Sequence, residues 1–176
     1  PAKATTYPLT IENCGHSVTF DHAPNRVVSI GQSNTEILYL LGLGEKLVGT
    51  AVWLGPVQEE FQIINETIPR LADNDPSFES VVGQKPDLVT VQFQWHVGPN
   101  GKVGSLGQFA ELSIPVYTAP ADCQGKDNTT GGDGTRIDAF SMDRIYQTID
   151  DLSQIFDVET RGAELITRLK TREQAA

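Results

Sequence analysis

Ser33 is the residue of this chain that comes nearest to a catalytic position. It lies in the stretch Gly31-Gln32-Ser33-Asn34-Thr35, between a short apolar run and a helical pattern. Serine hydrolases place their nucleophile at such a strand-to-helix turn, in the pattern G-x-S-x-G, where the second Gly leaves room for the sharp bend. Thr35 stands in place of that Gly, and no acid is placed to orient His96 as a base. A small hydrolase with Ser33 as nucleophile, or a flavodoxin-like protein, is the alternative prediction.

The residues after Ser33 offer a simpler role for it. Ser33 followed by Glu36 fits a capping box, in which the hydroxyl and the carboxylate each bond a backbone N–H at the start of a helix. Gly42 would end that helix. Its apolar stripe is Ile37, Leu38, Leu40 and Leu41.

Polar and aromatic residues also follow the predicted parallel strands. Residues 32–34 follow the first strand, Trp53 the second, and Trp95 and His96 the third. The carboxyl ends of parallel strands share one edge of the sheet, where open α/β folds bind ligands. We therefore expect a ligand surface there, with the two Trp rings stacking on a flat or conjugated molecule.

No pattern for a metal, a phosphate or a nucleotide is present. The three histidines, His16, His22 and His96, lack metal-ligand spacing, and the acidic residues of the loop at 124–135 do not match a calcium loop. Residues 42–44 (Gly-Leu-Gly) follow a helix, whereas a dinucleotide motif opens one. We predict no protein metal site and no intrinsic cofactor.

Two cysteines, Cys14 and Cys123, lie in polar loops far apart in the sequence. They form no C-x-x-C pair, which argues against zinc or thioredoxin-type chemistry. Two readings stay open: one disulfide in an oxidising compartment, or two unrelated free thiols.

Composition restricts the function classes further. The chain has 176 residues, 39% of them hydrophobic, and a net charge of −10. This suits a single domain with its own core, and it disfavours nucleic acid, whose binders carry clustered Lys and Arg. No apolar run approaches the length of a membrane span.

The pattern along the chain predicts an α/β fold. Residues 7–20 alternate as a β-hairpin; Ser77 would cap a helix over 78–84, and a further helix covers 106–112. Strands are expected at residues 27–30, 47–52, 87–91 and 114–117. This order predicts a three-layer α/β/α lobe around a parallel sheet of about four strands. We divide the chain into a lobe at 1–136 and terminal helices at 137–176.

Several segments, in order, resemble the iron-siderophore, haem and vitamin B12 substrate-binding proteins of ABC importers, also called class III solute-binding proteins. The resemblance covers roughly residues 9–120, and the helix from Val158 resembles the start of the helix that joins the two lobes of these proteins. The matching segments are Pro24-Asn25-Arg26-Val27-Val28, Ser33-Asn34-Thr35-Glu36, Phe78-Glu79, Lys85-Pro86-Asp87-Leu88-Val89 and Ile114-Pro115-Val116.

The resemblance implies a ligand held between two lobes, on the turns after the strands. It implies a ferric siderophore, haem or cobalamin as ligand, and a second lobe that this chain lacks. Few basic residues lie near these turns, which favours a neutral or cationic ligand. The residues expected to bind it are Gln32, Ser33, Asn34, Trp53, Leu54, Trp95, His96 and Asp122.

The resemblance also implies partners and a location. A surface Glu of the amino-terminal lobe docks to the membrane permease in these proteins, and Glu79 matches its position; a first-turn carboxylate favoured by the helix dipole is the other explanation of Glu79. We expect a non-enzymatic, monomeric protein outside the cytoplasm, periplasmic or anchored through lipid.

Overall fold

A central parallel sheet organises the fold, which we describe from a computed structural model for residues 3–129 and 133–176. Its strands lie in the order β5-β4-β3-β6-β7, and each neighbouring pair is parallel. β3 and β6 are buried along their whole length, as apolar strands covered on both faces should be. The strands are β3 (Val27–Ile30), β4 (Leu47–Ala51), β5 (Arg70–Ala72), β6 (Leu88–Val91) and β7 (Val116–Thr118).

The helices connect these strands or follow them. The α-helices are α1 (Gln32–Leu40), α2 (Gln62–Glu66), α3 (Phe78–Val82), α4 (Leu106–Glu111), α5 (Asp143–Ile155) and α6 (Glu159–Gln174). Short 3-10 helices are η1 (Gly44–Lys46), η2 (Glu59–Phe61), η3 (Gln94–His96) and η4 (Pro120–Asp122). Ser77 caps α3 as predicted, because its side chain accepts a hydrogen bond from the Ser80 N–H at 3.1 Å.

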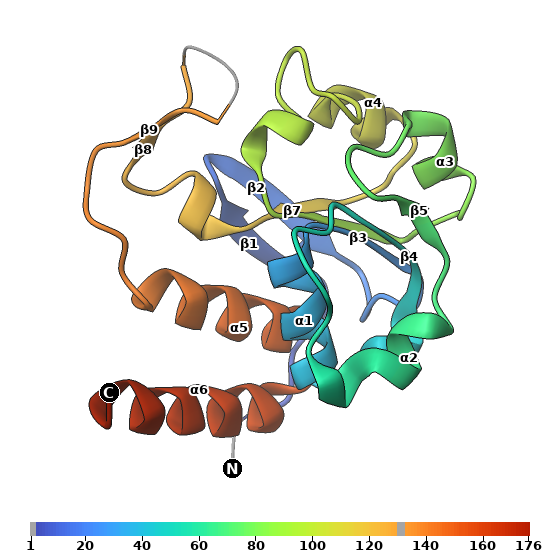
Figure 1. The fold of residues 1–176 in the computed structure, drawn as a ribbon. Coiled ribbons are helices and arrows are strands. Elements are labelled where there is room, and N and C mark those ends of the chain that lie inside the picture. The colour runs from blue at the N-terminus through green and yellow to red at the C-terminus, as the bar shows by residue number, and fades with distance from the viewer. Residues whose placement is uncertain (1–2, 130–132) are drawn as a thin grey trace.

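Helices cover both faces of the sheet (Figure 1). Successive strand side chains point to opposite faces, so Val27 and Leu88 join the core under α1 and α5, while Val28 and Val89 join the core under α3 and α4. The predicted three-layer α/β/α arrangement is confirmed.

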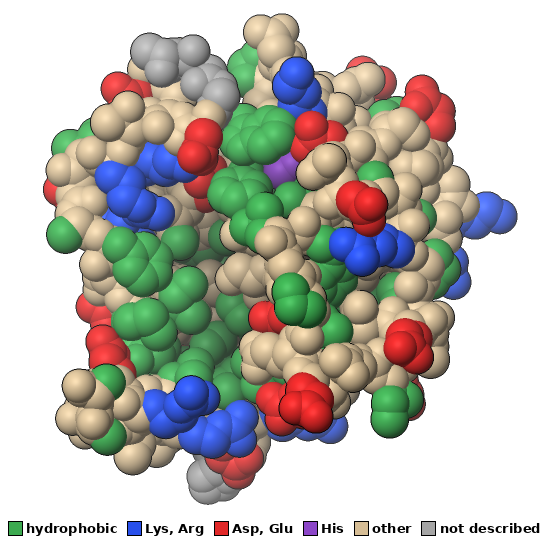
Figure 2. All heavy atoms as spheres, in the orientation of Figure 1, with side chains coloured by type: hydrophobic (Ala, Val, Ile, Leu, Met, Phe, Trp, Pro, Cys, Tyr) green, Lys and Arg blue, Asp and Glu red, His purple; other side chains and the backbone are tan. Residues whose placement is uncertain are grey.

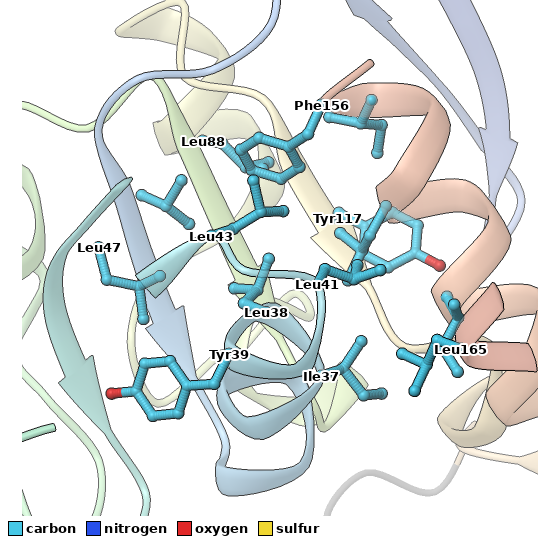
Figure 3. Close-up of a cluster of buried hydrophobic side chains, with 14 of the residues drawn as sticks. Ile37, Leu38, Tyr39, Leu41, Leu43, Leu47, Leu88, Tyr117, Phe156 and Leu165 are labelled. Atoms are coloured by element: carbon cyan, nitrogen blue, oxygen red, sulfur yellow. The ribbon is translucent and has the colours of Figure 1, made fainter. Parts of the chain in front are cut away.

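The larger core ties the final helices to the sheet. Figure 3 shows Ile37, Leu38 and Leu41 of the α1 segment gathered with Tyr117 of β7 and Leu165 of α6. α5 adds buried side chains to the same core. The proposed division of the chain at residue 136 stays a prediction.

The predicted hairpin is also present. β1 (Leu9–Asn13) and β2 (His16–Phe20) pair antiparallel, with Asn13 opposite His16. Cys14 and Gly15 connect them with φ values of 49° and 82°. Two consecutive positive φ angles are typical of the tight turn whose twist matches a hairpin.

The sheet has five strands rather than four, because β5 was not predicted. It is only three residues long, directly follows Pro69 and pairs with β4 alone. Such a short edge strand carries too few alternations to be recognised by periodicity. A second small hairpin, β8 (Lys126–Asp127) with β9 (Thr135–Arg136), was also missed.

The predicted capping box at Ser33 is wrong. α1 begins two residues earlier than predicted, so Gly31 rather than Ser33 is its N-cap residue, and no side chain caps it. Gly31 has a φ of 120°, which suits Gly and lets the chain turn directly from β3 into the helix. Gln92 instead satisfies the Ser33 N–H through its Oε1 at 3.0 Å.

Within the residues that the structure describes, no helix is both long and apolar enough to cross a membrane.

Candidate ligand-binding site

The turns after β3, β4, β6 and β7 meet at one edge of the sheet, as predicted from the strand order. A hollow of about 400 Å³ opens beside the turns after β3, β4 and β6. Figure 2 shows a hollowed, largely apolar surface on this face of the molecule. Its polar side includes Gln32, Ser33 and Gln92, and its apolar side includes Leu54, Met142 and Ile145.

Two glutamine side chains hold these turns together. The Oε1 of Gln32 accepts hydrogen bonds from the N–H groups of Leu54 at 2.9 Å and Gly55 at 3.1 Å. The Gln32 Nε2 donates to Glu36 at 3.2 Å. Together with the bond from Ser33 to Gln92, this joins the start of α1 to the ends of β4 and β6. Gln92 was not among the predicted site residues, although it directly follows a predicted strand.

The two tryptophans differ in their surroundings. Trp53 is only 8% exposed; its indole N–H donates to the Thr50 hydroxyl, and the Arg70 guanidinium lies over its ring. Trp95 is half-buried and stacks on His96, with ring centroids 4.0 Å apart. Trp95 therefore presents ring surface at this edge, whereas Trp53 packs mainly against the protein.

His96 faces inward. Its side chain is fully buried, its Nε2 lies 2.9 Å from the Asp75 carboxylate, and its Nδ1 lies 3.2 Å from the Phe93 carbonyl. Burial lowers the pKa of His96 even though Asp75 acts to raise it. His96 therefore packs against the Trp95 ring, and its imidazole is not accessible to a ligand.

Asn34 and Asp122 are also enclosed, with 1% and 5% exposure. Asp122 accepts the Gln94 N–H at 2.6 Å and forms an ion pair with Lys126. Asp122 belongs to the turn after β7, so its carboxylate holds the turn after β6 in place.

A positively charged residue that was not predicted, Arg136, lies at the same edge. Arg136 is exposed, donates to the Ala121 carbonyl at 2.8 Å, and stacks over the Phe140 ring. It comes from the loop that sequence reasoning left unassigned, and β8–β9 pairing brings it to the end of β7.

The structure offers no support for Ser33 as a nucleophile. The imidazole of His96 is enclosed and bonded to Asp75 rather than to the Ser33 hydroxyl. Among the described residues, no group of three or more His, Cys, Asp or Glu side chains could hold a metal ion.

The remaining predicted residues lie away from the hollow. Glu79 is exposed in the first turn of α3. Cys14 and Cys123 form a disulfide that joins the hairpin turn to the segment after η4. A second hollow, of about 460 Å³, lies between β2 and α4, but no predicted ligand-binding residue lines it.

Comparison with known proteins places the chain in a family. The model of the family described as periplasmic binding protein matches residues 27–176. An uncharacterized ABC transporter substrate-binding lipoprotein, YvrC of Bacillus subtilis, is 25% identical over 96% of this chain and 46% of its own length.

Solved structures agree. The structure described as an ABC-type Fe3+-hydroxamate transport system from Saccharomonospora viridis is 27% identical, with a TM-score of 0.76, over 97% of this chain and 56% of that one. A possible iron-binding (periplasmic solute-binding) protein from Staphylococcus epidermidis is 25% identical, with a TM-score of 0.61, over 85% of this chain and 48% of that one. This chain spans about half the length of these relatives, and it belongs to the periplasmic binding protein family.

Proposed function

We propose that this chain is the amino-terminal part of the substrate-binding component of an ABC importer and that it binds a metal chelate at the strand-end hollow. The observation that carries the proposal is that the turns after β3, β4 and β6 contribute side chains to one hollow at the carboxyl edge of the sheet. Open parallel sheets bind ligands at this edge. The family membership and the Fe3+-hydroxamate description of the Saccharomonospora viridis relative support the same choice.

The chemistry of the surface suits a ligand that carries its own metal. Gln32 and Gln92 supply neutral amide groups, Leu54 and Met142 supply apolar contact, and Trp95 supplies a partly exposed ring. Such a mixed surface, apolar with a few polar groups, is typical of small-molecule sites. We propose a ferric siderophore first, with haem and cobalamin as the other candidates, and no catalytic step.

Residues that the structure encloses take a supporting role in this proposal. Gln32, Ser33 and Leu54, which line the hollow, would contact the ligand. Trp95 would extend this surface from the turn after β6. Asn34, His96 and Asp122 would hold those contacts in place, because each has 5% exposure or less. Trp53 packs against Thr50 and Arg70 and takes no part in these contacts.

Titration of the full-length protein tests the ligand class. The probes are ferrioxamine B, haemin and cyanocobalamin, followed by tryptophan fluorescence. We expect one of them to bind, and Trp95→Ala to weaken its binding about tenfold, since an aromatic contact with a ligand is worth about 1–2 kcal/mol.

Trp53→Phe is the matched control for this titration. It removes the buried indole N–H but keeps an aromatic ring in the core, so ligand affinity should change by less than about threefold. Failure of all three probes would overturn the proposed ligand class, and unchanged affinity in Trp95→Ala would remove Trp95 from the site.

The proposal also includes the partner and the location. An importer delivers its ligand to a membrane permease, and Glu79 is the residue that we propose for docking to it. The Bacillus subtilis relative is described as a lipoprotein; a lipid-anchored, extracytoplasmic protein is the corresponding proposal here.

A further inference from the structure

The tip of the amino-terminal hairpin is fastened to the end of β7 by two different contacts. The Asn13 amide donates to the Thr118 carbonyl and accepts from the Thr118 N–H, both at 2.7 Å. The next residue, Cys14, forms the disulfide with Cys123. Both contacts join residues more than 100 positions apart in the sequence.

The Asn13 side chain bonds backbone groups of β7 that a neighbouring strand would otherwise bond. β7 is an edge strand of the sheet, and the hairpin is not part of that sheet. An edge strand leaves its outer N–H and C=O groups without a strand partner. At Thr118 the Asn13 amide satisfies both groups, and Asn13 and Thr118 are each only 4% exposed.

The segment between these two contacts carries Asp122. η4 starts two residues after Thr118 and ends at Asp122, next to Cys123. Asp122 accepts the Gln94 N–H at 2.6 Å, and Gln94 opens the turn that contains Trp95. Asn128 reinforces the link, because its Nδ2 donates to the Gln94 Oε1 at 2.6 Å and to the Asp122 carbonyl at 2.7 Å.

We propose that Asn13, the Cys14–Cys123 disulfide and Asp122 are positioning residues for the ligand surface. They hold the Gln94–His96 turn in the conformation that presents Trp95, although the hairpin itself lies outside the hollow. The effect on ligand affinity rests on the proposed function; the effect on the turn does not.

Preorganisation is the physical reason. A surface that is already ordered before binding does not have to lose conformational freedom when the ligand arrives. When the contacts to the hairpin are removed, η4 is held less rigidly. Asp122, which accepts the Gln94 N–H, then becomes more mobile as well. The ligand then has to order this turn on binding.

A purely structural role makes a different prediction. A disulfide that closes a long loop stabilises a whole fold by restricting its unfolded chain. Its loss would then raise hydrogen exchange mainly at amides that open through global unfolding, such as those of β3. A positioning role raises exchange locally, at Gln94.

Amide hydrogen exchange in the full-length protein distinguishes the two roles. The variants are Asn13→Ala, Asp122→Ala and the double variant Cys14→Ser with Cys123→Ser. We expect the exchange rate of the Gln94 amide to rise at least tenfold, and by a larger factor than that of Val28 in the central strand β3. Thr10→Ala is the control, because it removes only the exposed Thr10–Thr19 hydroxyl contact of the same hairpin.

Binding of ferrioxamine B, haemin and cyanocobalamin to the same variants provides the second measurement. We expect about tenfold weaker binding of whichever probe the unaltered protein binds, and no change in Thr10→Ala. An equal rise in exchange at Gln94 and Val28, or unchanged affinity, would overturn the positioning role. If the unaltered protein binds no probe, the proposed ligand class fails, and the exchange comparison still decides the role of the hairpin.

Discussion

Amide side chains, more than charged ones, connect the turns of the candidate site. Gln32, Gln92 and Asn13 each bond backbone groups of a neighbouring turn or strand. An amide both donates and accepts, so one side chain can satisfy two backbone groups without bringing a buried charge. Asp122 is a buried charged residue among these contacts, and Lys126 balances its charge.

At the same residue scale, His96 should make the stability of the protein depend on pH. Burial lowers the pKa of His96 in the folded state, so the unfolded chain binds more protons as the pH falls through the ordinary His value. The free energy of unfolding therefore rises with pH in this range. The contribution of His96 is complete above about pH 6.5 and is lost as the solution becomes more acidic.

Urea unfolding between pH 7.5 and about pH 5 checks this expectation. His96→Gln keeps a donor for Asp75 but does not titrate, so its free energy of unfolding should fall less with acid than that of the unaltered protein. Asp151 acts in the opposite direction, since burial raises its pKa to about 6, but it is present in both proteins. Parallel pH profiles would contradict the expected role of His96.

At the scale of elements, the passage from β3 into α1 depends on Gly31. Its φ is 120°, and a Cβ there would lie 2.2 Å from the Gln92 Cβ. Gly31→Ala should therefore lower the free energy of unfolding by about 2–4 kcal/mol, through backbone strain and overpacking. It should also displace Gln92 from the Ser33 N–H.

Urea unfolding of Gly31→Ala and Gly55→Ala provides the comparison. A Cβ at Gly55 meets no atom within 4 Å, so Gly55→Ala should change the free energy of unfolding by less than about 0.5 kcal/mol. Equal stabilities of the two variants would show that the β3–α1 turn tolerates a side chain.

Elements with a strong repeating pattern were predictable, and short ones were not. The β1–β2 hairpin and α4 were predicted within one or two residues. α5 carries apolar residues at helical spacing and lies in the region where terminal helices were expected. β5 and the β8–β9 pair are held by tertiary pairing, not by local preference.

At the scale of the whole molecule, the docking role that we propose for Glu79 can be separated from ligand binding. Glu79 is exposed on α3, which packs on the opposite face of the sheet from α1 and α5 (Figure 1). Glu79→Ala in the full-length protein should lower uptake of the bound probe several-fold and leave its affinity unchanged, because a charge at the rim of an interface acts mainly on association.

Uptake by cells and binding by purified protein are the two measurements. Glu66→Ala is the control, since Glu66 is likewise exposed at the end of a short helix. A loss of ligand affinity in Glu79→Ala, or an equal loss of uptake in Glu66→Ala, would count against docking through Glu79.

The parallel sheet, the hairpin and the edge at which the strand-end turns meet could all be predicted from the sequence. These follow from hydrophobic periodicity and from the rule that parallel strands end on the same side. The tertiary structure decided which side chains of those turns face outward. His96 faces inward because its Nε2 hydrogen-bonds the Asp75 carboxylate, and Trp53 packs against the Arg70 guanidinium.

Tertiary structure also brought residues to the site that no local pattern could indicate. Arg136 arrives through β8–β9 pairing, Met142 and Ile145 through packing of α5, and Asn13 through its bonds to Thr118. The direction of a side chain after a strand depends on partners that are distant in the sequence, and only the packed chain specifies those partners.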